Sequence, residues 1–70
     1  MAQFLIVIEK AERNYSAYAP DLPGCVATGK TREETVAAMR DALQLHLDGM
    51  RQDKEPIPTP TAGAEIISVP

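Results

Sequence analysis

Residues 15–34 read YSAYAPDLPGCVATGKTREE, and this stretch decides the fold because it contains four successive structural signals. A short alternating segment (15–19) leads into the turn sequence PDLPG (20–24), a second apolar segment follows, and a helix-start sequence begins at Thr31. Proline fixes φ and restricts the residue before it, while glycine can adopt positive φ, so the turn has few conformations to lose on binding. We therefore expect a strand, a rigid turn, a strand and a helix, with the turn as a preformed surface.

Three short strands are predicted at residues 3–8, 15–19 and 25–28, and the polar segment 9–14 is predicted to connect the first two as a hairpin. The first strand is apolar on both faces, which is typical of a strand at the centre of a sheet. Alternation puts Phe4, Ile6 and Ile8 on one face and Leu5 and Val7 on the other. Tyr15 and Tyr18 fall on opposite faces of the second strand, so at most one of them can lie in the core under a helix. For Tyr18, core packing and a place in a protein interface are both open.

A helix is predicted from Thr31 onward. Thr31 and Glu34 match the capping box, in which each side chain satisfies a backbone N–H at the start of a helix. Apolar residues at spacings of three and four predict the stripe that packs on the sheet: Val36, Met39, Leu43, Leu47 and Met50. Because glycine is unfavourable inside a helix, the end is expected between Gly49 and Asp53.

The C-terminal region predicts a connector and one more strand. Prolines at every second position of EPIPTP (55–60) favour an extended chain, and residues 64–69 are rich in apolar β-formers. A right-handed crossover would place this last strand parallel to the first. The expected fold is α+β, in the order β-β-β-α-β, with sheet order 3-2-1-4 and one helix on one face. The other face would be open and apolar, which indicates an association surface.

Size and charge limit the class of protein. Seventy residues form a single small domain (1–70), in which about 60% of the unfolded surface is buried on folding, so we expect a homo-oligomer, either a dimer or a tetramer. A net charge of −3 gives no basic surface for direct nucleic-acid binding and favours a basic protein partner. The N-terminal apolar run becomes charged at Glu9, too soon for a signal peptide or a membrane span, so a cytoplasmic protein without membrane contact is expected.

Few residues could carry chemistry. Cys25 is the single cysteine and His46 the single histidine, so neither an intrachain disulfide nor a metal-ligand cluster is expected. We interpret Cys25 as a small buried side chain, the alternative being a redox or partner contact, and His46 as a partly exposed helix residue, the alternative being a functional contact. Asp21 is expected to cap nearby backbone donors in an Asx-type turn, to dock on a partner, or both.

The predicted sheet order resembles part of the ribonuclease H fold, in which inward-facing acids bind two metal ions, so a metal-dependent hydrolase is one hypothesis. The sequence argues against it, because the centre of the first strand is Leu5-Ile6-Val7 and the acids fall at the ends of the predicted elements. These acids are Glu9, Asp21, Glu34 and Glu65. We expect solvated or capping roles for them, with no catalytic residue, no metal and no cofactor.

The run YxAYxPDLPGC at 15–25, continued by GxTxEE at 29–34 and an amphipathic helix, resembles the HicB-type antitoxin family. The resemblance extends over roughly residues 2–70 and implies a partial ribonuclease H-like fold without nuclease activity. It also implies that the chain binds and masks a small basic mRNA-cleaving toxin of double-stranded-RNA-binding fold. Family members commonly carry a C-terminal helix-turn-helix or ribbon-helix-helix region, and no such DNA-binding domain is expected in this chain, which stops at Pro70.

The resemblance assigns family-type structure and toxin contact to the matching residues of the motif: Tyr18, Pro20, Asp21, Leu22, Pro23 and Gly24. Three functions follow as hypotheses: an antitoxin-like module that covers a basic ribonuclease, a solitary self-assembling domain without a toxin partner, and the metal-dependent hydrolase. The negative charge, the rigid turn and the motif favour the first. The first two are compatible, because symmetric oligomers of antitoxins are expected from the resemblance.

Overall fold

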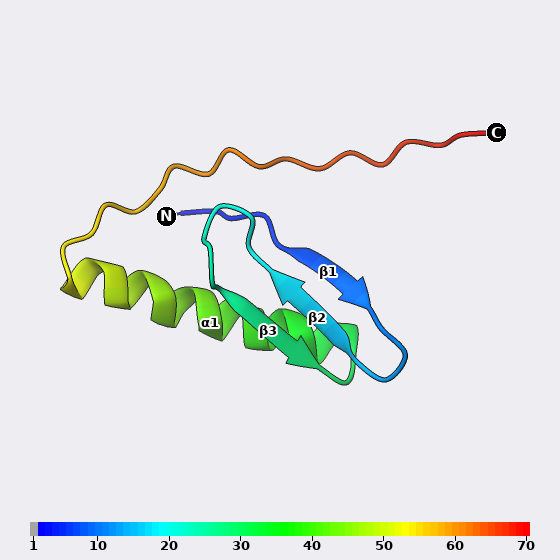
Figure 1. Ribbon diagram of the computed structural model, residues 1–70, viewed down its shortest axis with the longest axis horizontal. Coiled ribbons are helices and arrows are strands. Elements are labelled where there is room, and N and C mark those ends of the chain that lie inside the picture. Colours follow the sequence, from blue (N-terminus) through cyan, green and yellow to red (C-terminus); the bar gives the residue numbers. More distant parts are fainter. Residues whose placement is uncertain (1) are drawn as a thin grey trace.

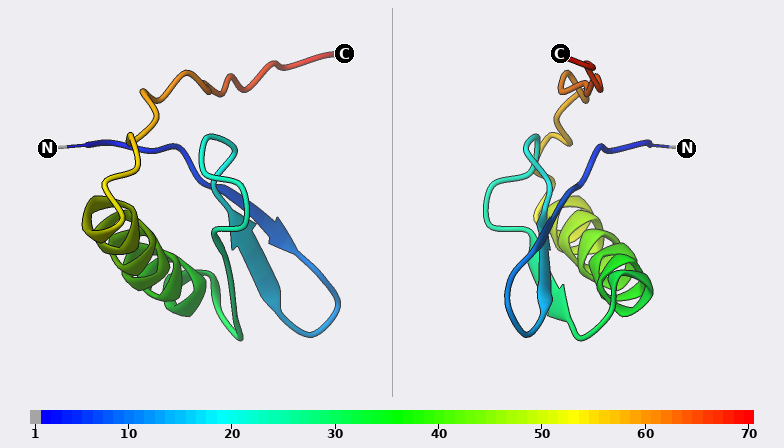
Figure 2. Two further views of the ribbon diagram at one scale, coloured as in Figure 1. Left: turned by 60° about the vertical axis from the view of Figure 1, so that its left-hand side comes forward. Right: turned by 90° about the vertical axis from the view of Figure 1, so that its right-hand side faces the viewer.

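Three antiparallel strands form a sheet, and one long helix covers one of its faces (Figures 1 and 2). The computed structural model describes residues 2–70. The elements within them are β1 (Val7–Lys10), β2 (Tyr15–Tyr18), β3 (Val26–Gly29) and α1 (Arg32–Gln52). The strand order is β1-β2-β3. The α+β class is therefore confirmed.

The strand register separates the two faces of the sheet. Val7 pairs with Tyr18 and Tyr18 with Val26, so these three side chains share the face away from the helix. On the face toward the helix, the buried Ala17 lies between Ile8 and Ala27. The predicted alternation is thus confirmed, and of the two tyrosines it is Tyr18 that lies on the open face.

The helix begins as the capping motif predicts. The Thr31 side chain accepts a hydrogen bond from the backbone N–H of Glu34 at 3.0 Å. The Glu34 carboxylate reaches back to the N–H of Lys30, at 3.1 Å, one residue before the position expected for a standard capping box. α1 ends at Gln52, inside the predicted range. Near its end, carbonyl groups accept hydrogen bonds from the N–H groups of Lys54 and Glu55. Lys54 has a φ of 56°. This is the Schellman motif, with lysine in the position that usually holds glycine.

The core lies between α1 and the sheet, and α1 packs most extensively against β3. Its buried hydrophobic residues are Ala17, Ala19, Leu22, Cys25, Met39 and Leu47. The predicted stripe supplies Met39 and Leu47, while Leu43 and Met50 pack at the margin. Thr35, which the stripe omitted, is fully buried and donates its hydroxyl to the carbonyl of Thr31 at 2.8 Å.

The first strand is shorter than predicted and starts later. The sequence predicts residues 3–8, whereas β1 pairs only from Val7 to Lys10. Continuing the register, the residues before Val7 would face Ala19 and Pro20. The N–H of Ala19 points toward β3, where it bonds to the carbonyl of Cys25. Residue 20 would supply the next donor toward β1, and proline has no N–H. Pro20 therefore stiffens the turn and also ends the pairing.

The predicted fourth strand is not formed in this chain, so the order 3-2-1-4 reduces to 3-2-1 and the ribonuclease H-like arrangement is not confirmed. Residues 64–69 run outward from the body of the molecule (Figure 1), and their side chains are exposed. The proline-rich connector (55–60) has neither helix nor strand, as expected, and only Ile57 packs against the core. Because a strand needs the hydrogen bonds of a neighbour, a segment led away from its own sheet has none.

We expect Gly29→Ala to lower the free energy of unfolding by about 1–3 kcal/mol, because an added Cβ would lie 2.6 Å from Thr35 Oγ1 and 2.8 Å from its backbone nitrogen. Gly49→Ala is the matched control, since its Cβ would meet no atom within 4 Å and alanine is favoured in a helix by about 1 kcal/mol. Urea unfolding at one fixed protein concentration measures both. If Gly29→Ala is as stable as the parent, the helix does not approach β3 this closely.

Candidate partner-binding surface

The turn between β2 and β3 forms a closed corner, defined here as residues 19–25. Three backbone hydrogen bonds hold it: Leu22 N–H to Ala19 O at 3.1 Å, Cys25 N–H to Leu22 O at 3.1 Å, and Ala19 N–H to Cys25 O at 3.2 Å. Gly24 has a φ of 85°, a conformation that side chains with a Cβ disfavour. Figure 2 shows the corner standing beyond the ends of the two strands. The rigid turn expected from the sequence is present.

Leu22 fastens the corner to the core. Its side chain is 1% exposed and belongs to the same cluster as Met39. Pro20, Pro23 and Gly24 are exposed above it. Of the six residues that the motif assigns to structure or contact, Leu22 therefore has a structural role within the chain, and a partner would meet the exposed ones.

Asp21 joins the corner to the C-terminal region. Its carboxylate accepts hydrogen bonds from the N–H of Ala62 at 3.1 Å, the N–H of Thr61 at 3.3 Å and the hydroxyl of Thr61 at 3.1 Å. The bond from Ala62, assisted by Thr61 and opposed by desolvation, lowers the pKa of the Asp21 carboxyl below its ordinary value. The predicted Asx-type cap is wrong, because the donors come from 40 residues further along the chain.

Apolar side chains continue from the corner onto the open face of the sheet. Tyr18 is 41% exposed and Val26 is 64% exposed. They are cross-strand partners, and Val7 completes the row. A large amphipathic side chain beside a rigid, exposed turn is typical of protein interfaces. We define Val7, Tyr18 and Val26 as the open-face row.

Cys25 and His46 line one hollow of about 290 Å³, between the corner and α1. The sequence separates them by 21 positions and gave no sign that they would meet. Cys25 is buried, as predicted, and burial raises the pKa of its thiol, which makes it a poor nucleophile at neutral pH. His46 is partly exposed, as predicted. The other lining residues are mostly apolar, so Cys25 and His46 border an apolar hollow rather than forming a reactive pair.

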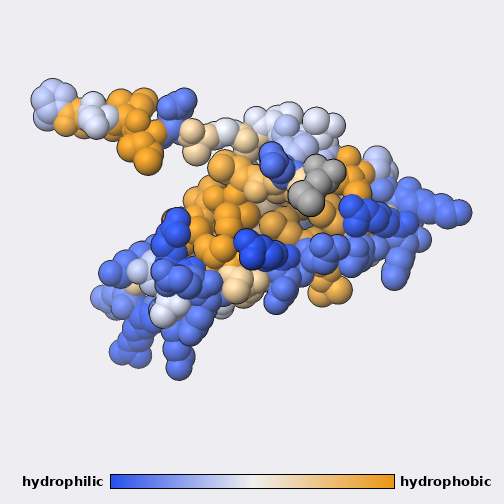
Figure 3. All heavy atoms as spheres, turned by 180° about the vertical axis from the view of Figure 1, so that it is seen from behind, coloured by the Kyte–Doolittle hydropathy of each residue, from blue (hydrophilic) through white to orange (hydrophobic). Residues whose placement is uncertain are grey.

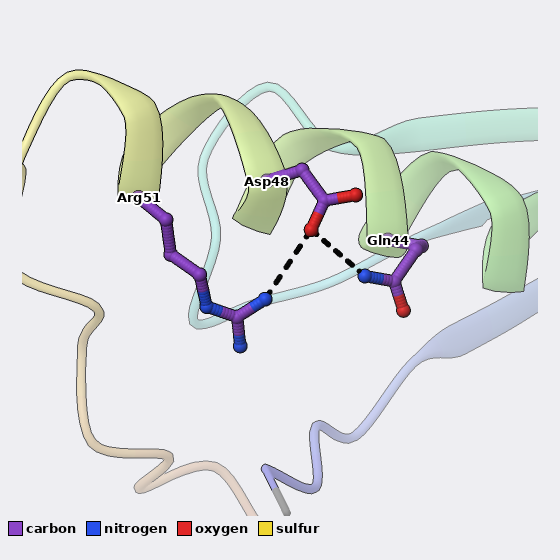
Figure 4. A network of polar contacts seen from close by, with 3 residues as sticks. All are labelled: Gln44, Asp48 and Arg51. Atoms are coloured by element: carbon purple, nitrogen blue, oxygen red, sulfur yellow. Dashed lines mark hydrogen bonds and ion pairs between the residues drawn. The ribbon is translucent and has the colours of Figure 1, made fainter.

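Several acids are engaged in hydrogen bonds at the surface. Figure 4 shows Asp48 accepting from Gln44 at 2.9 Å and pairing with Arg51 at 3.3 Å, on exposed turns of α1. Such exposed pairs add little to stability. Among residues 2–70, no three His, Cys, Asp or Glu side chains gather as metal ligands. In the same part of the chain, no helix is long and apolar enough to cross a membrane.

Comparison with known proteins identifies the family. A family model described as the HicB-like antitoxin of bacterial toxin-antitoxin systems matches residues 4–70. The match covers the corner, the helix and the C-terminal segment. The chain therefore belongs to the HicB-like antitoxin family, which confirms the resemblance drawn from the motif.

Individual relatives agree with this assignment. The chain is 35% identical over 69 residues to "Antitoxin HicB 2" of Photorhabdus laumondii, covering 97% of this chain and 50% of that protein. It is 34% identical over 65 residues to an uncharacterised 14.9 kDa protein of Haemophilus phage HP1, covering 93% of this chain and 49% of that protein. A UPF0150 protein of Helicobacter pylori is 42% identical over 48 residues, which is 69% of this chain and 67% of that protein. The chain thus spans about half the length of two of these relatives.

We expect the link between Asp21 and the C-terminal region to be lost in acid. The pKa of the Asp21 carboxyl is lower in the folded chain than its ordinary value of 3.8, so the ionised carboxylate stabilises the fold at pH values above 3.8. This contribution disappears as the pH falls through the pKa of the folded state. In an NMR titration, the backbone amides of Thr61 and Ala62 should shift together with an apparent pKa below 3.8. Asp21→Asn should abolish the transition, and Asp41→Asn should leave it unchanged. Amide signals that stay constant while Asp21 titrates would contradict the link.

Proposed function

We propose that this chain is the antitoxin of a toxin-antitoxin pair and that it binds and masks a small, basic, mRNA-cleaving toxin. Family membership supports the antitoxin role in general. The corner supports the more specific part of the proposal, the binding of the toxin. It is closed by three backbone hydrogen bonds and lies beside the exposed Tyr18. A surface already fixed in its bound shape loses little entropy on association.

The contact surface of the proposal consists of the exposed corner residues and the open-face row. Pro20, Pro23 and Gly24 provide a rigid, uncharged edge, and Tyr18 provides the largest side chain next to it. The net charge of −3 would attract a basic partner over a distance and raise the rate of encounter. Binding by shape needs no reactive group, so we propose that the chain is not an enzyme and requires no cofactor or metal.

The proposal includes self-association into a dimer or tetramer in the cytoplasm. The outer edge of β1 has no partner strand within residues 2–70, and a small domain gains stability by covering such an edge. Masking of the toxin and self-association are compatible, since the corner and the edge of β1 lie on different parts of the sheet. The alternative of a solitary domain without a toxin has no observation that favours it over the antitoxin.

Co-expression with the protein encoded by the neighbouring gene tests the proposal. We expect a small basic protein to co-purify with this chain. Expression of that protein alone should arrest growth, and co-expression of this chain should restore it. The dissociation constant should rise with ionic strength, because charge attraction is screened. If the neighbouring product neither binds at low salt nor arrests growth, the antitoxin proposal fails.

Within that complex, we expect Tyr18→Ala to weaken binding by about tenfold, because aromatic side chains at the centre of interfaces contribute most of the binding energy. The matched control is Gln44→Ala, which shortens an exposed side chain on α1 that does not line the hollow beside Val26. Its affinity should stay within about twofold of the parent. Equal losses in the two variants, measured by isothermal titration calorimetry, would show that the open face is not the contact surface.

A further inference from the structure

An apolar groove of about 190 Å³ lies between α1 and the segment that precedes β1. Its lining residues are Phe4, Ile6, Val36, Arg40 and Leu43. Figure 3, seen from behind, shows hydrophobic surface gathered in the middle of this side of the molecule. β1 lies at the margin of the sheet, so within residues 2–70 its outer edge has no partner strand. An open strand edge and an apolar groove therefore lie side by side, which is the arrangement that accepts an added strand.

The C-terminal arm, defined as residues 64–69, has the composition of such a strand. Ile66, Ile67 and Val69 are 98%, 78% and 80% exposed, which is unusual for β-branched side chains in a folded chain. Figure 3 shows a second hydrophobic stretch on the part of the chain that extends away from the body of the molecule. In an extended chain, Glu65, Ile67 and Val69 share one side. The arm is thus apolar on both sides, like a strand with neighbours on each face.

The groove and the arm also carry opposite charges. Arg40 lines the groove, and Glu65 is in the arm. Arg51 is paired with Asp48, whereas among the described residues neither Arg40 nor Glu65 has an ion-pair partner within 4.0 Å. If Glu65 faces the helix, Ile67 and Val69 point into the apolar part of the groove on the same side of the strand. A single register of the docked arm thus pairs Glu65 with Arg40 and places Ile67 and Val69 in the apolar part of the groove.

The arm of this chain does not lie in its own groove. The Asp21 carboxylate fixes Thr61 and Ala62 beside the corner. From there the chain runs away from the body of the molecule in all three views (Figures 1 and 2). The occupant that matches this direction is the arm of another copy.

We propose that two copies exchange their C-terminal arms, each arm docking beside β1 of the other copy with Ile67 and Val69 in the groove and Glu65 against Arg40. The exchange is reciprocal, so it closes a twofold-symmetric dimer and leaves no arm exposed. It completes the sheet with the fourth strand that the sequence predicts, but supplies that strand from the partner. The inference rests on the self-association proposed above and adds its mechanism.

Charge reversal in the chain of residues 1–70 tests the exchange. We expect Arg40→Glu and Glu65→Arg each to raise the dimer dissociation constant at least about tenfold, because each variant sets like charges together at both contacts of its own dimer. Mixing the two variants should restore the dimer, since every contact in the mixed pair then joins opposite charges. Sedimentation velocity measures the mass in each sample. Lys30→Glu is the control for Arg40→Glu, because it makes the same charge change directly after β3, which does not adjoin β1. Its dimer should be unaffected.

The outcomes separate the exchange from self-association as such. If the parent is a monomer at micromolar concentration, both proposals fail. If the parent is a dimer and neither charge reversal weakens it, self-association stands and the exchange is wrong. If mixing fails to restore the dimer while the double variant Arg40→Glu with Glu65→Arg does, the arm docks within its own chain, and the exchange is again wrong. Ile67→Asp keeps the fold, because this side chain is outside the core, and it should abolish the dimer while the helical circular dichroism signal remains.

Discussion

The arrangement of this molecule depends on the close approach of α1 to β3. Gly29 leaves no room for a Cβ next to Thr35, and small residues on the strands let Met39 reach full burial. This contact holds the helix over the β3 side of the sheet. The β1 side is consequently less covered, and the groove opens there. One steric constraint thus determines both where the core is closed and where the chain remains available to another polypeptide.

The two prolines of the corner impose a second constraint on the structure. Both stiffen the turn, and Pro20 also ends the pairing between β1 and β2 after Tyr18. The segment before Val7 is therefore extended without a partner on that side, next to the groove. The Asp21 carboxylate then fixes the start of the C-terminal arm beside the same corner. The corner thereby serves as a proposed toxin contact and as the point from which the arm is directed outward.

Much of this could be predicted from the sequence, because the signals are local. The cap at Thr31, the alternation in β2 and the burial of Cys25 each depend on neighbouring residues, and the structure confirms them. The long-range features could not be predicted. Nothing within a few residues of Asp21 indicates donors 40 positions away, and strand propensity at 64–69 does not state which chain supplies the neighbouring strand. The placement of Cys25 and His46 around one hollow likewise depends on how the helix crosses the sheet.

The most direct test of this account is an isotope-filtered NMR measurement on a mixture of labelled and unlabelled chains, which detects contacts between different copies only. The account predicts nuclear Overhauser effects from the Ile67 methyl groups of one copy to Phe4 and Leu43 of another. If these effects appear only within single chains, or if the Ile67 methyl groups remain at random-coil positions in the dimer, the groove has another occupant and the account is contradicted.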